Sequence, residues 1–371
     1  MQIQTTPSAR LYWRPTAFID APFGLDGQFA RLAGGMQFFA AWHVVATDSG
    51  KRAGHWLIPI DRVEDALAGL SEAQAQASRA MIANAIAPRA ALQLGERVIR
   101  LDQPQVMAIL NMTPDSFSGG SACLDDPAAA ADQAVQMAAA GAAMIDIGGE
   151  STRPGAQIVW EQDELNRVAP VIAALKLSGT AISLDTRKAA VMEAGLAAGA
   201  HMINDVSALL YDDRALEVVA GAECPVVLMH YPGKPGSPHE APPYDDPLIN
   251  VYDWLKARLN AVVAAGIARE RILLDPGIGF GKGVAENMAI LNGLALLHGL
   301  GRPLVLGASR KRIVGALSNE APADQRLSGS IALAMKGVEQ GVQIVRVHDV
   351  PETVQAIRVW RGGRDAALSG A

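Results

Sequence analysis

A stretch of thirteen residues at positions 106–118, VMAILNMTPDSFS, decides the fold of this chain. Its first five residues are apolar, as in a buried strand, and the residues that follow supply an amide, hydroxyls and a carboxylate. In parallel α/β proteins, ligands bind at the carboxyl ends of the strands. The stretch therefore predicts a buried parallel strand that delivers polar groups to a binding site.

The same pattern repeats through the rest of the chain, where short apolar runs alternate with alanine-rich helical segments. Such runs are typical of strands buried on both faces. The expected strands cover residues 106–110, 144–147, 181–184, 202–203, 226–229, 272–274, 304–306 and 344–347. The expected helices include residues 127–141, 161–177, 188–199, 249–266 and 329–340, several of which end at glycine. Eight such units predict an α/β protein with a closed (β/α)8 TIM barrel, and an open doubly wound sheet is the alternative.

Residues 1–91 do not follow this rhythm and are expected to form an N-terminal α+β extension of unknown role. Strands are expected at residues 37–47 and 55–60, and one or two helices at residues 64–86. Trp13, Trp42 and Trp56 are expected in a core rather than stacked on a ligand. Residues 92–371 are assigned to the barrel, and residues 92–103 are expected to form a hairpin that closes its bottom.

The composition excludes several classes of protein. Half of the 371 residues are hydrophobic, which suffices for a large core, and the formal net charge is −6. No long basic run indicates a nucleic-acid surface, and two cysteines provide no disulfide framework. The N-terminus lacks the layout of a signal peptide, and the longest early apolar stretch, residues 33–46, is too short to span a bilayer. These features predict a soluble cytoplasmic protein without a membrane partner.

Polar residues follow each expected strand, and a barrel would bring all eight strand ends to one face. The cationic and hydroxyl side chains of this set suit a polyanion such as a phosphate: Thr152, Arg153, Ser309, Lys311, Arg346 and His348. The carboxylates and the amide can pair with the ring nitrogens and amino group of a heterocycle: Asp185, Asn204 and Asp275. The sequence therefore predicts a ligand with a polar ring at one end and phosphates at the other.

Each of these residues also has a plainer interpretation when taken alone. Asp185 can be a helix N-cap, Lys311 a surface charge and His348 a histidine of the barrel core. Asp115 and Asp205 fit loop-bracing roles equally well.

Two familiar kinds of site are not expected. The glycine-rich segment 277–283 is not a P-loop, because position 276 is proline and position 283 is glycine. His201, His239 and His298 are expected to be structural or exposed to solvent, which argues against a histidine-based metal site. A hard cation bound mainly by oxygen is the consistent choice.

Nine motifs in order resemble the dihydropteroate synthase family across residues 92–360. They are NMTPDSFS, DIGGESTRPGA, SLDTRK, INDVS, LMH, LLDPGIGFGK, GASRKR, RLSGS and RVHDV. The resemblance implies a (β/α)8 barrel that condenses 6-hydroxymethyl-7,8-dihydropterin pyrophosphate with p-aminobenzoate. The products would be 7,8-dihydropteroate and pyrophosphate, formed by a dissociative, SN1-like path.

The resemblance also implies roles for individual residues. Pyrophosphate would be bound by Asn111, Thr152, Arg153, Arg346 and His348, with Asn111 also holding Mg²⁺. The pterin would be bound by Asp185, Asn204, Met229, Asp275 and Lys311. p-Aminobenzoate would be bound by Phe117, Thr152, Pro154, Phe280 and Ser309. Catalysis would rest on Asp185, Lys311, Arg346 and His348.

Three positions depart from the pattern usual in the family: Gly119 in the first loop, Arg187 after the third strand, and Tyr231-Pro232 after the fifth.

The resemblance further implies a homodimer through late barrel helices and a target for sulfonamides. Two other functions fit the same barrel, namely a pterin-dependent methyltransferase, which binds no pyrophosphate, and a barrel subunit without catalysis.

Overall fold

The chain's structure, a computed structural model, describes residues 2–113, 126–152, 156–233 and 243–369. Within these residues, eight parallel strands form one sheet in the order β12-β11-β10-β9-β8-β7-β14-β13. A parallel bridge joins the two ends of this order, between Leu274 in β12 and Leu304 directly before β13. This bridge closes the sheet into the expected (β/α)8 barrel, and the open doubly wound alternative is wrong.

The barrel strands coincide with the apolar runs of the sequence to within two residues. They are β7 (Gln105–Asn111), β8 (Met144–Gly148), β9 (Ile182–Asp185), β10 (Met202–Asp205), β11 (Val226–Met229), β12 (Ile272–Asp275), β13 (Val305–Leu306) and β14 (Ile344–Val347). Asn111, Asp185, Asp205 and Asp275 are the last residues of their strands, so the strands run into the polar residues instead of stopping before them.

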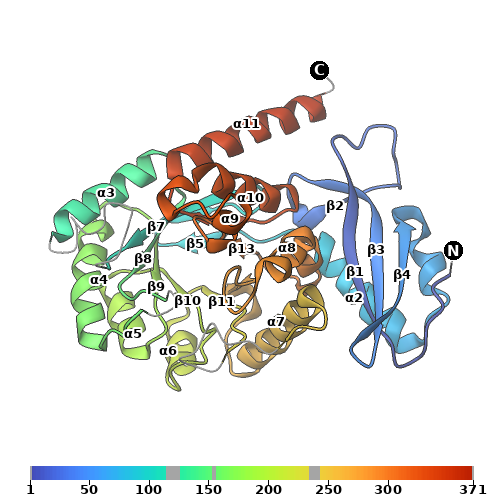
Figure 1. Cartoon of the computed structure of the whole chain (residues 1–371), viewed down its shortest axis with the longest axis horizontal. Helices are drawn as coiled ribbons and strands as arrows, with labels where there is room; N and C mark the ends of the chain where they lie inside the picture. Colours follow the sequence, from blue (N-terminus) through green and yellow to red (C-terminus); the bar gives the residue numbers. More distant parts are fainter. Residues whose placement is uncertain (1, 114–125, 153–155, 234–242, 370–371) are drawn as a thin grey trace.

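Helices surround the barrel and follow its strands in turn (Figure 1). They are α3 (Pro127–Ala139), α4 (Glu161–Lys176), α5 (Ala189–Ala198), α6 (Ala215–Ala222), α7 (Pro247–Ala264), α8 (Val284–Asn292), α9 (Arg312–Leu317), α10 (Leu327–Glu339) and α11 (Val350–Ser369), with the 3₁₀ turns η4 (Arg269–Arg271), η5 (Leu294–Leu300) and η6 (Ala323–Gln325). The five helices expected from the sequence are confirmed. None of the helices in the described ranges is long and apolar enough to cross a membrane.

The lower end of the barrel is a closed apolar core. The hairpin of β5 (Leu92–Leu94) and β6 (Arg97–Ile99) packs its buried leucines and isoleucine against inward-facing residues at the start of the strands. Those residues include Met107, Met144, Val227 and Leu273. The hairpin expected at residues 92–103 is therefore confirmed, and it plugs the bottom of the barrel.

Residues before the hairpin form a separate antiparallel sheet that packs on two helices. The elements are β1 (Arg10–Ile19), β2 (Ala30–Arg31), β3 (Phe38–Asp48), β4 (Lys51–Pro59), α1 (Val63–Leu67) and α2 (Glu72–Ile86), with the 3₁₀ turns η1 (Leu32–Gly34) and η2 (Ile60–Arg62). Strand β3 pairs with the three other strands. Trp13 and Trp42 are buried in its core, as expected, and Trp56 is half-buried against it. Strand β1 was not expected from the sequence.

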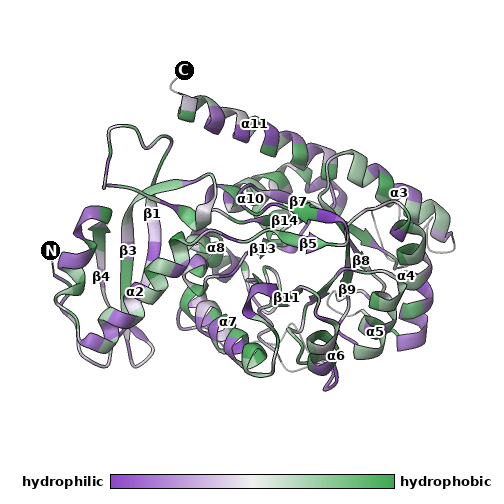
Figure 2. Ribbon diagram, turned by 180° about the vertical axis from the view of Figure 1, so that it is seen from behind, coloured by the Kyte–Doolittle hydropathy of each residue, from purple (hydrophilic) through white to green (hydrophobic). Residues whose placement is uncertain are grey.

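This N-terminal sheet and its helices, residues 2–86, lie against the barrel beside α7 and α8 (Figures 1 and 2). The apolar cores of the two parts form one continuous cluster. Tyr12 and Tyr252 meet edge to face with 5.6 Å between ring centroids, and both the Tyr12 hydroxyl and Arg10 donate to Asp253. Farther along the contact, Arg89 donates to the carbonyl of His298 at 3.1 Å. The extension is thus docked on the barrel through both apolar packing and directed hydrogen bonds.

Candidate active site

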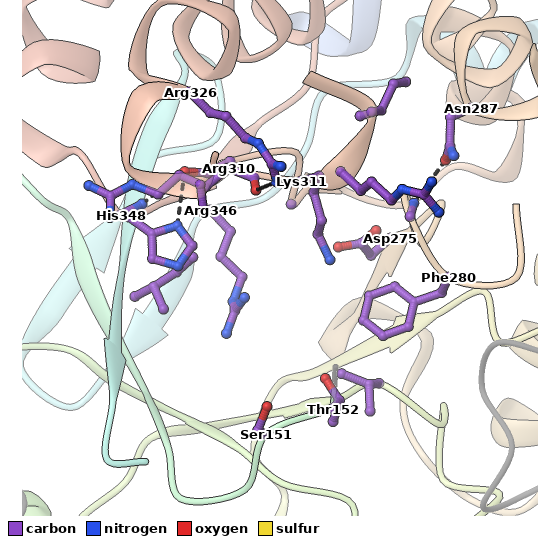
Figure 3. Close-up of a pocket in the computed structure, with 18 of the residues that line it drawn as sticks. Ser151, Thr152, Asp275, Phe280, Asn287, Arg310, Lys311, Arg326, Arg346 and His348 are labelled. Atoms are coloured by element: carbon purple, nitrogen blue, oxygen red, sulfur yellow. Dashed lines mark hydrogen bonds between the residues drawn. The ribbon is translucent and has the colours of Figure 1, made fainter. Parts of the chain in front are cut away.

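The carboxyl ends of the barrel strands surround a pocket of about 690 Å³. Ten of the residues singled out from the sequence line it: Asn111, Thr152, Asp185, Asn204, Asp275, Phe280, Ser309, Lys311, Arg346 and His348. Figure 3 shows Lys311 and Arg346 reaching into the open space from one side, with Ser151 and Thr152 facing it from the other. Side chains separated by up to 237 positions in the sequence (348 − 111) therefore converge on one cavity, as a barrel requires.

Arg346 lies at the centre of the polar cluster. Its Nε donates to Asp146 Oδ2 at 2.5 Å and its Nη2 donates to Asp185 Oδ2 at 2.6 Å. Burial disfavours the charged guanidinium, but the two carboxylates outweigh burial and raise the pKa of Arg346. Arginine has five N–H donors, so donors remain for a ligand after these two bonds. Arg346 is therefore a permanent cation, held in place at its inner edge.

The carboxylates and the amide expected to face a heterocycle line the same pocket as Arg346. Asp275 Oδ1 accepts from the backbone N–H of Gly277 at 2.7 Å, and a Cβ placed on Gly307 would lie 3.7 Å from Asp275 Oδ2 and 4.0 Å from Arg346 Cδ. Asp275 and Arg346 thus approach the same small glycine. A single small molecule can contact both residues.

Burial changes the protonation of the acids in the pocket. It raises the pKa of Asp275, while the N–H of Gly277 and the nearby cations oppose this rise. Burial also raises the pKa of Asp185 to about 7, again against the pull of Arg346. Such poised carboxylates are typical of functional sites.

The loop after β12 brings an aromatic ring and a lysine to the pocket. Gly277 has a φ of +67°, and a Cβ there would meet the carbonyl oxygen of His230 at 2.3 Å, so only glycine fits. Lys282 folds back to donate to the carbonyls of Gly277 and Phe280 at 2.8 and 3.0 Å. The ammonium of Lys311 lies 4.2 Å from the centre of the Phe280 ring. This geometry is that of a cation–π contact, which joins the loops after β12 and β13.

A buried ion network fixes the start of the loop after β8. Glu150, directly before Ser151 and Thr152, accepts from Arg187 at 2.9 and 3.2 Å and lies 3.2 Å from Lys188 Nζ. These bonds outweigh burial and lower the pKa of Glu150. Arg187, one of the departures from the family pattern, also covers the ring of Tyr211 at 3.9 Å. Arg187 therefore holds the base of this loop in place.

Other expectations have mixed outcomes. Ser309 Oγ and His348 Nδ1 are 3.0 Å apart, so His348 belongs to the pocket and not to the apolar core. Asp185 does not cap α5, because Asp212 accepts from the N–H of Ala189. Asp205 braces its own loop through bonds from the backbone N–H groups of Ser207 and Leu209. His298 and His201 contact backbone groups, as expected of structural histidines.

Some predicted site residues are not on the pocket surface that the structure describes. Met229 lies behind the wall, in a small apolar cluster with Val206, Tyr231 and Phe280. Three further predicted site residues lie outside the described part of the chain: Phe117, Arg153 and Pro154. Asp115 and His239, for which other roles were considered, lie outside it as well.

Polar residues of the site that were not among those predicted include Asp146, Glu150 and Lys282. Glu150 and Lys282 line the pocket, and Asp146 binds Arg346 from below. A carboxylate within the apolar run of residues 144–147 is the signal that could have identified Asp146.

The oxygens around Asn111 bear on metal binding. A Cβ on Gly148 would lie 3.6 Å from Asp185 Oδ2 and 3.7 Å from Asn111 Oδ1, so these two oxygens border one spot. In the described residues, no three His, Cys, Asp or Glu side chains cluster in a way that could hold a metal ion. Two oxygens on an open pocket suit a hard ion such as Mg²⁺, which keeps several waters and takes further ligands from phosphates.

Comparison with known proteins assigns this arrangement to a family. Residues 107–348 match the family described as pterin binding enzyme. Dihydropteroate synthase of Neisseria meningitidis serogroup B (strain ATCC BAA-335 / MC58) is 45% identical over 273 residues, which cover 72% of this chain and 95% of that protein. The solved structure of Xanthomonas albilineans dihydropteroate synthase with 4-aminobenzoic acid has a TM-score of 0.68 at 44% identity and covers 74% of this chain and 98% of that one. A second structure of that enzyme, in complex with 7,8-dihydropteroate, has a TM-score of 0.66 at 42% identity and covers 73% and 98%.

Proposed function

The chain belongs to the pterin binding enzyme family and, within it, to the dihydropteroate synthases, and we propose that it joins a dihydropterin pyrophosphate to p-aminobenzoate. The reaction is a transfer of the dihydropterinylmethyl group from pyrophosphate to the arylamine nitrogen, giving 7,8-dihydropteroate. One observation carries this proposal: Asp275 and Arg346 border the same glycine in one pocket. A molecule with a pterin ring and a pyrophosphate would contact both.

The pterin half of the substrate fits the acidic and amide side of the pocket. Asp275 keeps Oδ2 for a ligand because Oδ1 already accepts from Gly277. Asn204 donates its Nδ2 to Asp146 at 3.0 Å, which leaves its carbonyl oxygen to accept from the ring. Lys311 would donate to a ring carbonyl or nitrogen from above Phe280. Met229 would support the ring from behind.

The pyrophosphate half fits the cationic side. Arg346 would donate its remaining N–H groups to the pyrophosphate oxygens, together with His348, Asn111 and Thr152 and with Arg153. Ser309 holds His348 at 3.0 Å and so sets the direction of its ring. Donors fixed in advance around a leaving anion lower the barrier because no reorganisation is needed during the reaction.

The bond from the methylene carbon to the pyrophosphate oxygen would break before the new C–N bond is complete. The electron pair goes to pyrophosphate, and the positive charge that remains is shared with the pterin ring. Asp185 would stabilise that cation in its ionised form. An arylamine is neutral near pH 7, so it attacks without prior deprotonation and requires mainly positioning. The proton that its nitrogen loses once the C–N bond has formed goes to solvent. Phe280 and Ser309 border this part of the pocket, and Phe117 and Pro154 would complete it.

Mg²⁺ is part of the proposal, with Asn111 Oδ1 as its protein ligand and pyrophosphate oxygens as further ligands. The ion would supply positive charge to the departing pyrophosphate. The site fits it, because Asn111 Oδ1 borders the open spot beside Gly148, and Mg²⁺ usually keeps several waters and takes further ligands from phosphates.

Assembly and location stay predictions. A homodimer through late barrel helices has to accommodate the N-terminal sheet, which contacts α7 at Asp253. It also has to accommodate Arg89, which binds the carbonyl of His298. We therefore propose a dimer that uses late-helix surface left uncovered, in the cytoplasm. The mass in solution, measured by light scattering for the full chain, tests this: the mass of a single chain would contradict it.

A pyrophosphate-release assay tests the function. We expect release only when dihydropterin pyrophosphate and p-aminobenzoate are both present, together with dihydropteroate as product. A pterin-dependent methyltransferase would bind pterin without releasing pyrophosphate, and a barrel without catalysis would release none. A sulfonamide, which also carries an arylamine, should compete with p-aminobenzoate in the same assay.

A further inference from the structure

Asp146 is a fully buried carboxylate in the middle of β8, with 0% of its surface exposed. Residues alternate across a strand, and Met144, two positions earlier, belongs to the apolar core inside the barrel. Asp146 therefore also points inward, one step above the plug and directly below the pocket. A buried carboxylate in an apolar strand is costly unless it is paired and hydrogen-bonded.

Both partners of Asp146 are residues of the proposed substrate site. Its Oδ2 accepts from Asn204 Nδ2 at 3.0 Å and from Arg346 Nε at 2.5 Å. Asn204 is on β10 and Arg346 on β14, so one oxygen joins two strands on opposite sides of β8. One of these partners is assigned to the pterin ring and the other to the pyrophosphate.

The bond from Asn204 fixes the direction of its amide. A free asparagine side chain can present either its oxygen or its nitrogen to a ligand. The carboxylate of Asp146 can only accept, so it selects the rotamer in which Nδ2 points down. The carbonyl oxygen is then presented to a ring donor such as the amino group of a pterin.

The bond from Arg346 fixes the inner edge of the guanidinium. Asp146 and Asp185 bind two different nitrogens, and this fork leaves the remaining N–H groups directed away from them. The negative charge of Asp146 also compensates a cation that is otherwise buried. Without Asp146, Arg346 would pair with Asp185 alone. Asp185 is the carboxylate that is expected to face the substrate cation.

We propose that Asp146 is a positioning residue that aligns the pterin acceptor Asn204 and the pyrophosphate donor Arg346 for one substrate. This inference rests on the proposed function. Asp146 itself does not touch the substrate, since it is buried below both partners. It links the recognition of the ring to the binding of the leaving group.

The test uses Asp146→Asn and Asp146→Ala in the full chain, with Ser183→Ala as the matched control. Ser183 is the register neighbour of Asp146 on β9 and is equally buried, and its hydroxyl has no hydrogen-bond partner among the described residues. Binding of 6-hydroxymethylpterin, which lacks pyrophosphate, is measured by calorimetry. Steady-state kinetics give kcat and the KM of each substrate, and thermal unfolding shows that each variant is folded.

We expect Asp146→Ala to weaken pterin binding about tenfold and to lower kcat/KM for the pterin pyrophosphate roughly a hundredfold, because two directed bonds lose their acceptor. The isosteric Asp146→Asn keeps an acceptor oxygen and should lose less. The KM of p-aminobenzoate should stay within about twofold, since neither partner is assigned to that ring. Ser183→Ala should match the wild-type protein in all of these measurements.

A double-variant cycle separates positioning from a general structural role. If Asp146 acts through Asn204, adding Asp146→Ala to Asn204→Ala should weaken pterin binding by less than about twofold more. Pterin binding that is unchanged in both Asp146→Asn and Asp146→Ala would overturn the inference. A double variant whose loss of pterin affinity equals the product of the losses in Asp146→Ala and Asn204→Ala would overturn it as well. A wild-type protein that binds pterin but releases no pyrophosphate would instead contradict the proposed function, while the binding cycle still decides on Asp146.

Discussion

The two ends of the barrel use the same strands for opposite purposes. At the lower end, Met144 and Leu273 face inward and pack against the β5–β6 hairpin in an apolar cluster. Two residues farther along the same strands, Asp146 and Asp275 face inward and bind polar partners. A step of about 7 Å along a strand thus separates a dry core from a charged site.

This difference shows where stability and function are placed in the chain. The lower end buries apolar side chains, which stabilises the fold. The upper end buries carboxylates beside Arg346, and replacing such buried ion pairs by apolar residues is often neutral or stabilising. The charges of the upper end therefore have a functional reason, and substitutions at the two ends should have separable effects.

The largest effect is expected from Arg346→Ala. It should lower turnover roughly two orders of magnitude or more, the scale of losing one donor that stabilises a developing anion. Arg346→Lys keeps the charge but loses the fork that binds Asp146 and Asp185, so it should remain well below the wild type. Steady-state kinetics check both variants, with the exposed Arg214→Ala as the control. Near-normal kcat in Arg346→Ala would refute the role assigned to the upper end.

Leu94→Ala should destabilise the apolar core at the lower end of the barrel without changing the site at the upper end. Leu94 is 1% exposed and packs in the plug, so its truncation should lower the free energy of unfolding by about 3 kcal/mol. The KM values of the folded variant should not change. Val98→Ala, in the same hairpin but 62% exposed, is the control and should change stability by less than about 0.5 kcal/mol. Denaturant unfolding gives these free energies, and equal losses in both variants would contradict a buried plug.

Lys311→Ala should weaken pterin binding about tenfold, because a donor to the ring and a cation over Phe280 are lost together. The exposed Lys256→Ala on α7 removes the same charge far from the pocket and should leave binding unchanged. Calorimetry with 6-hydroxymethylpterin measures both. Unchanged pterin affinity in Lys311→Ala would count against the assignment.

The smallest effect concerns pH. Burial lowers the pKa of Lys282 to about 7 from 10.5, against the pull of Asp275. Between about pH 7 and pH 10.5, Lys282 carries a proton in the unfolded chain but not in the folded chain. The contribution of Lys282 to the free energy of unfolding therefore rises with pH across this range. We therefore expect the stability of the wild type relative to Lys282→Met to be greater near pH 10 than near pH 7. Urea unfolding at both pH values would contradict this if the difference stayed constant.

The fold was largely predictable from the sequence because each barrel strand is a local pattern. Apolar runs bounded by polar residues and glycines identified all eight strands and the plug, and only strand ends shifted. The N-terminal sheet was less readable: β1 carries Arg10, Arg14 and Pro15 and lacks a clear alternation, so it was missed. Its strand state depends on pairing with β3, which is a tertiary contact.

The candidate site was predicted in its residues but not in its pairings. Barrel geometry brings the strand ends together on one face, and it therefore predicted the convergence of Asp185, Asn204, Asp275 and Arg346. The sequence by itself thus determined the order of strands, the polar face and the family. The tertiary structure alone decided that Asp146 binds Asn204 and Arg346, that Arg187 anchors the loop of Thr152, and that the extension docks beside α7. The reason is physical: hydrogen bonds depend on distances of a few ångströms between residues as far apart as 146 and 346, which no local pattern encodes.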